Sequence, residues 1–196
     1  RNCIYRGSFN DFLKTLAENK DFQRLQGFNG VHKRMLDVER ALRFFAFADL
    51  TERRYKGPLS SFLNSYMESH REISEKQKED KLASFKKSVE LCQMVFGGLA
   101  LRRWRLGDAD DPNGYPENVV NEGLLDIEMY GFTEYDKRDV ADKTMAIKEA
   151  VIDLMSEDQG FITSIEKGTY DTAQVKLRTE KWFQKLRGVV GYPAGD

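Results

Sequence analysis

Hydrophobic residues recur at helical spacing along most of the chain. The clearest stripes cover residues 59–67, 82–96, 137–155 and 172–187, where apolar side chains follow one another at steps of three and four residues. Stripes of this period predict amphipathic helices that each bury one face. Two shorter helices with the same spacing are expected between residues 8 and 28.

Residues 37–50 differ from these stripes because they are apolar on nearly every side. The segment brings Phe44, Phe45 and Phe47 together within about one turn of helix. A helix that is hydrophobic all round belongs in the interior of a protein. We therefore expect this helix in the middle of the core, with Phe45 buried, and we expect Trp182 to be buried on the last helix.

Residues with known capping or turn chemistry mark where these helices begin and end. They predict a helix start after Gly57-Pro58, capping boxes formed by Ser74 with Gln77 and by Ser156 with Gln159, a helix stop at Gly97-Gly98, and a further helix from about Glu117. Residues 99–106 fit a short strand or an extended turn, and residues 108–116 fit a loop. The pattern predicts a mainly α fold: one compact multi-helix domain over residues 1–196, with about seven to nine helices and at most a short strand near 99–106.

Composition indicates a globular protein and removes some classes of function. Apolar residues make up 40% of the chain and charged residues 32%, enough for a core inside a well-solvated surface. The net charge is only −1, so no overall basic field points to nucleic acid or to an anionic membrane. No apolar run approaches the ~18 residues that a membrane-spanning helix needs. Cys3 and Cys92 match no metal or redox spacing, which favours a reduced, cytoplasmic protein.

Charge is nevertheless distributed unevenly along the chain. Residues 108–136 hold nine acidic residues and no Lys or Arg, whereas residues 167–187 hold six basic residues against two acidic ones. Two interpretations remain open for these segments. They form two solvated faces, or the second is a basic helix that meets phosphate or an acidic partner.

A second basic feature follows the predicted helix stop at Gly97-Gly98. Three arginines surround an indole here, and such a group can hold phosphate while the ring stacks on a base. Alternatively, Trp104 packs in the core and the arginines pair with the acidic segment. The candidate nucleic-acid or partner-binding residues are Arg34, Arg102, Arg103, Trp104, Arg105, Lys176, Arg178, Lys181 and Lys185.

Motifs for catalysis and for metal binding are missing from the sequence. There is no phosphate-binding loop, no nucleophile elbow, and no calcium loop with its required ligands. The two histidines, His32 and His70, have no Cys or His at metal-ligand spacing. We therefore expect no catalytic residue, no metal site and no cofactor in this chain.

Short stretches spread along the chain follow the order of segments in a known family. They lie at residues 1–7 with 9–10, 33–35 with 39 and 42–47, 62–67, 95–97 with 101–102, 121–126, 168–169, and 175–178. Together they resemble the family of domain of unknown function 262, the ParB-like module of GmrSD-type modification-dependent restriction proteins. The resemblance carries over Arg34, Arg43 and Arg102. We interpret Arg43 as structural because Glu39 lies one helical turn before it.

The resemblance implies a neighbouring domain that is missing from this sequence. In the family, a mixed α/β, ParB-like domain with an Asp-Gly-Gln-Gln-Arg motif precedes the helical portion and handles nucleotide, and no such run occurs here. The chain is thus expected to be a helical fragment that follows this domain. The resemblance also implies that the parent protein is a nucleotide-dependent restriction endonuclease of phage defence, with a nucleoside triphosphate and a divalent metal as cofactors and DNA as a partner.

Two functions remain open at this point. The first is the helical support or recognition portion of such a GmrSD-type, DNA-targeting protein, itself non-catalytic. The second is a stand-alone helical protein–protein interaction module with no nucleic-acid role. The ordered segments and the Arg-Trp turn favour the first function, whereas the near-zero net charge favours the second. The sequence leaves the oligomeric state open.

Overall fold

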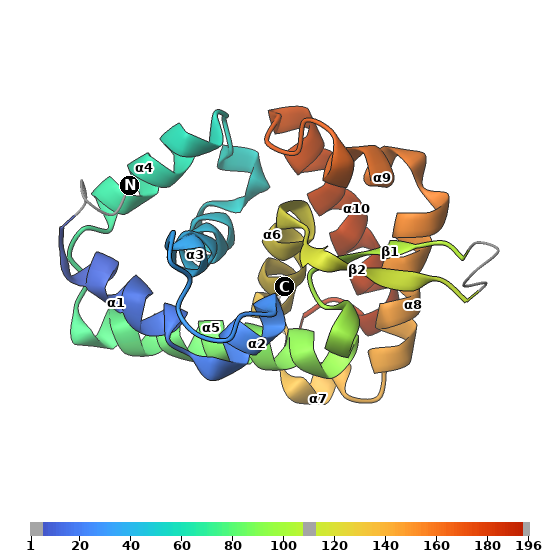
Figure 1. The fold of residues 1–196 in the computed structure, drawn as a ribbon, viewed down its shortest axis with the longest axis horizontal. Coiled ribbons are helices and arrows are strands. Elements are labelled where there is room, and N and C mark those ends of the chain that lie inside the picture. The colour runs from blue at the N-terminus through green and yellow to red at the C-terminus, as the bar shows by residue number, and fades with distance from the viewer. Residues whose placement is uncertain (1–5, 108–112, 194–196) are drawn as a thin grey trace.

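A computed structural model describes residues 6–107 and 113–193 of the chain (Figure 1). Its ten α-helices within these ranges confirm the predicted mainly α fold. In chain order they are α1 (Ser8–Ala17), α2 (Lys20–Gln26), α3 (Leu36–Arg54), α4 (Leu59–Ser69), α5 (Glu75–Phe96), α6 (Glu122–Gly131), α7 (Lys137–Val140), α8 (Thr144–Glu157), α9 (Gln159–Glu166) and α10 (Thr172–Val190). The other elements are the 3-10 turns η1 (Gly97–Leu99) and η2 (Phe132–Glu134) and the strands β1 (Arg102–Arg105) and β2 (Tyr115–Val120). Among the described residues, no helix is both long and apolar enough to cross a membrane.

The interior is organised around α3, which packs against α1, α4, α6 and α10 (Figure 1). Phe44 and Phe45 on α3 are 1% and 2% exposed, and both rings pack against Phe85 of α5. Trp182 of α10 is fully buried beside Phe96. The buried apolar residues of the described ranges form one cluster that extends from α1 to α10. The predicted central helix and both predicted core residues are therefore confirmed.

The predicted helix boundaries are confirmed at both ends of α5. At its start, the Gln77 N–H donates to the Ser74 hydroxyl and the Ser74 N–H donates to the Gln77 side chain, which completes the capping box. At its end, Gly97 has a φ of 53°, in the left-handed region that glycine adopts without steric cost. The start of α4 directly after Gly57-Pro58 is confirmed as well.

The segment before α6 is a strand, although its sequence pattern predicts a helix from about Glu117. β2 pairs antiparallel with β1 in a two-stranded sheet, with Arg105 opposite Tyr115. α6 begins only after Asn121, whose side chain accepts an N–H from the first helical turn. The prediction was wrong because β1 supplies the cross-strand partner, and spacing within one segment does not reveal a partner in another.

The predicted helix over residues 137–155 is divided in two. α7 ends after one turn at Val140, and the Lys143 N–H donates to the Val140 carbonyl in the turn that precedes α8. The apolar stripe continues across this break, since Val140, Ile147 and Val151 are all fully buried. The periodicity therefore predicts the buried residues correctly, but it does not predict the interruption of the helix.

The second predicted capping box is also wrong. Ser156 lies inside the last turn of α8, and Asp158 caps α9 by accepting the Phe161 N–H at 2.9 Å. Asp and Ser have similar preferences for the N-cap position, so local sequence did not decide between two candidates two residues apart. The cap therefore shifts by two residues without adding a helix, whereas the division of the predicted helix over residues 137–155 adds one.

Candidate functional site

β1 carries three of the predicted binding arginines, and carboxylates of the chain hold two of them. Arg103 is only 9% exposed and forms an ion pair with Glu166 at the end of α9. Arg105 pairs with Glu117 on β2 and lies 3.5 Å from Glu166. Burial, together with the charge of Arg105, lowers the pKa of the Arg103 guanidinium. Both arginines are therefore engaged by acidic side chains of β2 and α9.

Arg102 lies at the base of the β1–β2 hairpin and binds backbone carbonyls. Its Nη1 donates to the oxygen of Ala100 at 2.7 Å and to that of Leu25 at 3.0 Å. Burial lowers the pKa of the guanidinium, and the charge of Glu128 opposes this effect. The Arg102 side chain thus connects β1 to the last turn of α2.

Trp104 is half-buried and packs against the hydrophobic core. Gly114, just before β2, lies so close that a Cβ at this position would come within 2.9 Å of the indole. Gly114 also has a φ of 75°, so both the available space and the backbone conformation require glycine. The indole is therefore in contact with its own chain on the core side and at the hairpin.

The four predicted basic residues of α10 do not share one exposed face. Lys176 forms an exposed ion pair with Glu180, one helical turn further on, with Nζ 3.7 Å from Oε1. Lys181 pairs with Asp158, and its hydrogen bond is the main cause that lowers the pKa of that carboxyl. Lys185 is exposed beside a hollow of about 540 Å³ between α8 and α10. Arg178, by contrast, is fully buried.

Arg34 is exposed in the turn that precedes α3, where its backbone N–H donates to His32 Nδ1 at 3.3 Å. The nine predicted binding residues therefore lie at very different depths, from the exposed Arg34 and Lys185 to the buried Arg178. Among them, the structure brings Arg103 and Arg105 together around Glu166.

Arg178 belongs to a buried charge network that the sequence did not reveal. Its Nη2 lies 2.9 Å from Oδ2 of Asp126 on α6. Arg43 of α3 binds both oxygens of the same carboxylate, at 2.8 and 2.7 Å. All three side chains are at most 2% exposed. Asp126 therefore clamps α3, α6 and α10 together in the interior.

The structural role predicted for Arg43 is confirmed, but its partner is Asp126 and not Glu39. Burial alone would lower the pKa of Arg43, and the charge and hydrogen bonds of Asp126 raise it above its ordinary value. Tyr170 covers the guanidinium, with its ring centroid 5.1 Å from Cζ. The two-point contact with one carboxylate replaces the weaker helix-surface pair that the spacing predicts.

The network continues toward the surface through further polar partners. Arg40 on α3 binds Glu122 at the start of α6, with Nη2 2.6 Å from Oε1. Arg178 also donates from Nη1 to the carbonyl of Thr169 at 2.6 Å and to that of Ser164 at 3.3 Å. The network therefore fastens the turn between α9 and α10 as well as the helices.

Asp126 and Glu128 were hidden among the nine acidic residues of the segment 108–136. The signal that could have found them is the helix in which they lie, because every residue from 123 to 131 is buried. A carboxylate in so apolar a helix needs a buried partner. Of this segment, Asp108, Asp110 and Asp111 lie outside the described residues, as do Cys3 and the first five residues of the resemblance.

A second polar cluster links α3, α4 and α5 nearer the surface. Tyr66 donates its hydroxyl to Asp49, and Lys81 Nζ donates to Asp49 at 2.7 Å and to the Tyr66 oxygen at 3.0 Å. His70 stacks on Tyr66 with ring centroids 4.0 Å apart. Burial and the hydrogen bond to Asp49 hold the pKa of Tyr66 above its ordinary value. These groups satisfy one another, so the cluster fastens three helices.

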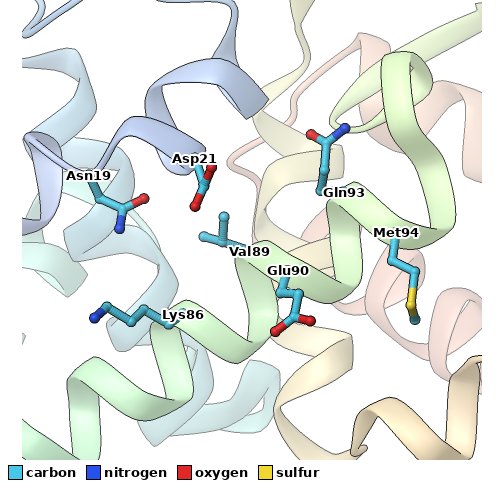
Figure 2. A pocket seen from close by; sticks show the side chains of 7 residues that line it. All are labelled: Asn19, Asp21, Lys86, Val89, Glu90, Gln93 and Met94. Carbon is cyan, nitrogen blue, oxygen red and sulfur yellow. The ribbon is translucent and has the colours of Figure 1, made fainter.

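The hollow shown in Figure 2 lies between α2 and α5 and has a volume of about 600 Å³. Its lining residues are Asn19, Asp21, Lys86, Val89, Glu90, Gln93 and Met94. Asp21, Lys86 and Glu90 surround Val89, so side chains of both charge signs border it (Figure 2). Oε1 of Glu90 lies 2.6 Å from Nζ of Lys137, and Asp21 forms an ion pair with Arg24 on the same helix. The hollow therefore shows no preference for one sign of ligand charge.

The best-defined polar feature of the described chain is the network of Arg43, Asp126 and Arg178, which is closed to ligands. No protein-family model matches the chain, and neither the curated proteins nor the solved structures give a match. Function is therefore inferred from the residues of the chain itself.

Proposed function

We propose that this chain is the helical support portion of a GmrSD-type, nucleotide-dependent, DNA-targeting defence protein. In this role it catalyses no reaction, and it holds a neighbouring ParB-like domain in place. The observation that carries the proposal is the convergence of several resembling segments on one buried carboxylate.

Three separate segments of the resemblance supply one residue each to the buried network: Arg43, Asp126 and Arg178. A fourth, residues 168–169, supplies the carbonyl of Thr169 that accepts from Arg178. Residues that lock helices together are the ones a support domain requires. The convergence therefore supports the resemblance and a structural role at the same time.

The pairing of the basic residues favours support over direct contact with DNA. A phosphate that bound Arg103 or Arg105 would have to displace Glu166 or Glu117. Burial removes Arg178 from any surface contact. Contact with DNA is therefore assigned to the neighbouring domain of the parent protein.

The nucleoside triphosphate and divalent metal implied by the resemblance are assigned to that same domain. Nowhere in residues 6–107 and 113–193 are three His, Cys, Asp or Glu side chains grouped so that they could hold a metal ion. The described residues therefore do not fit the metal.

The proposal is tested on the coding region upstream of Arg1 and on the protein that it encodes. We expect an Asp-Gly-Gln-Gln-Arg sequence there, nucleotide hydrolysis by the longer protein, and blank rates for the present chain with nucleoside triphosphates, divalent metal and plasmid. An Asp-to-Asn change in that upstream motif is the matched control and should abolish turnover. Turnover by the present chain that survives re-purification and disappears on mutating one of its residues would contradict the proposal.

A second candidate function is a stand-alone helical interaction module. The net charge of −1 and the internal pairing of Arg103 and Arg105 favour it. An upstream region without the nucleotide motif, combined with protection of this chain from proteolysis by a purified protein partner, would select the second function over the first.

A further inference from the structure

Glu128 lies on α6 and contacts Leu101, the residue that directly precedes β1. Its side chain is completely buried. One carboxyl oxygen, Oε2, accepts the backbone N–H of Leu101 at 2.7 Å. The other, Oε1, has no hydrogen-bond partner among the described residues. A buried carboxyl with one donor and one unpaired oxygen is unusual and calls for a physical explanation.

The hydrogen bond from Leu101 holds the base of the hairpin. Leu101 has a φ of 61°, a left-handed conformation that is sterically unfavourable for a residue with a side chain. Its carbonyl accepts the N–H of Asn121 at 2.8 Å, just before α6 begins. Hydrogen bonds therefore link Glu128 to Leu101, and Leu101 to Asn121, where β1 and β2 enter the molecule.

The groups that face Glu128 do not neutralise a negative charge at this position. Cys92 on α5 is a buried thiol, and burial together with Glu128 raises its pKa. Arg102 on β1 carries the opposing charge, but its Nη1 is bound to two backbone carbonyls. The positive charge of Arg40 on α3 lowers the pKa of Arg102 further. Burial raises the pKa of Glu128 to about 8, and the Leu101 N–H and Arg102 offset this only in part.

We propose that Glu128 is a proton-controlled latch: in its uncharged form it holds the hairpin base closed, and its ionisation opens residues 100–102 to water. The neutral carboxyl accepts the Leu101 N–H without a charge to solvate. An ionised carboxylate in the same place is desolvated and has one donor, so water reaching the strained turn lowers its free energy. This inference goes beyond the proposed function and does not rest on it.

The direction of the pH effect follows from proton linkage. In the closed state Glu128 has a raised pKa of about 8, whereas a solvent-exposed Glu titrates near 4.3. The closed state therefore binds the extra proton between these values. Closure is fully favourable below about pH 4, weakens by up to tenfold per pH unit through that window, and levels off above about pH 8.

Opening of the latch would weaken the contacts of the positively charged residues at the start of the hairpin. Arg102 and Arg103 follow Leu101 directly in the chain, and the hydrogen bonds of Arg102 to Ala100 and Leu25 span the same turn. A rise in pH would therefore loosen the attachment of β1 to the helical body.

The experiment is hydrogen exchange of the Leu101 and Asn121 amides from pH 5 to pH 8.5, corrected for intrinsic exchange rates. In the unmodified chain, protection of both amides should fall with increasing pH, by up to about tenfold per unit. Glu128→Gln keeps the acceptor oxygen and cannot ionise, so its protection should be independent of pH. Glu79→Gln, an exposed acid on α5, is the matched control and should behave like the unmodified chain.

A direct titration of the Glu128 side-chain carboxyl by carbon-13 NMR completes the test, and it does not depend on any variant folding. A midpoint well above the ordinary Glu range supports the latch. A midpoint near pH 4–5, or equal slopes of protection against pH in the unmodified chain and in Glu128→Gln, would overturn it.

Discussion

Arg178 shows how a charged residue can be misjudged from its neighbours in sequence. The basic-helix interpretation placed it with Lys181 and Lys185, yet its side chain is fully buried against Asp126. Its position on the apolar stripe of α10 predicts this burial. Arg178 lies three residues after Val175 and four before Trp182, on the same face as both. An arginine on a buried stripe implies a buried acid, which Asp126 supplies from α6.

Removal of the shared carboxylate should be strongly destabilising. Asp126→Asn leaves Arg178 buried without a negative partner and Arg43 with only Glu122, 3.9 Å away. Leaving a buried charge unpaired typically costs about 3–5 kcal/mol. Urea unfolding of the purified chain measures this change. Lys176→Gln, on an exposed side chain of the same helix as Arg178, is the control and should change stability by less than about 0.5 kcal/mol. Equal midpoints for the two variants would contradict the clamp.

Core positions on α3 and α10 allow a second test at the residue scale. Phe45→Ala and Trp182→Ala each remove a buried ring from the central cluster and should cost about 3–5 kcal/mol, through lost transfer energy and the cavity left behind. Met145→Ala, at a side chain that is 71% exposed, is the control. Thermal unfolding checks the ranking, and a variant that melts within about 2 °C of the parent would contradict the packing.

At the scale of elements, predictions succeeded where a helix carries its own boundary signals. The Ser74 capping box and the glycine at the end of α5 depend on contacts within a few residues, so they could be derived from the sequence. β2 could not be derived in this way. Its conformation depends on pairing with β1, which is a different segment of the chain.

The capping box gives a prediction for α5 alone. Ser74→Ala removes the acceptor for the Gln77 N–H and should destabilise the chain by about 1 kcal/mol. The same substitution at the exposed Ser65, inside α4, removes no cap and should be neutral or slightly stabilising. Chemical denaturation with both variants separates the cap from the general effect of replacing serine.

For the whole molecule, the distribution of charge argues against a continuous DNA-binding surface. Glu166 and Glu117 neutralise arginines of β1, and the net charge of the chain is −1. A free phosphate-binding surface needs basic groups that release counterions from the nucleic acid when they bind. Arginines that are already paired contribute little to such a release.

Salt dependence tests this conclusion on the intact chain. Any duplex binding by this chain alone is then nonspecific, so changing Arg102, Arg103 and Arg105 together to Gln should leave its slope of log affinity against log salt nearly unchanged. If all three contacted phosphate, the slope would flatten by up to about three units. Fluorescence anisotropy with labelled duplex at several salt concentrations measures the slope. Trp104→Ala is the control, because loss of stacking releases no counterions.

The sequence by itself determined the helical character of this protein, the central position of α3, and the burial of Phe45 and Trp182. These features follow from local periodicity and from capping residues close to the helix ends. Only the tertiary structure decided that residues 115–120 form a strand, that Asp126 is shared by two arginines, and that Glu128 is enclosed beneath the hairpin. These features depend on contacts between residues that are far apart in the sequence. The spacing of residues within one segment does not determine which distant residue packs against it.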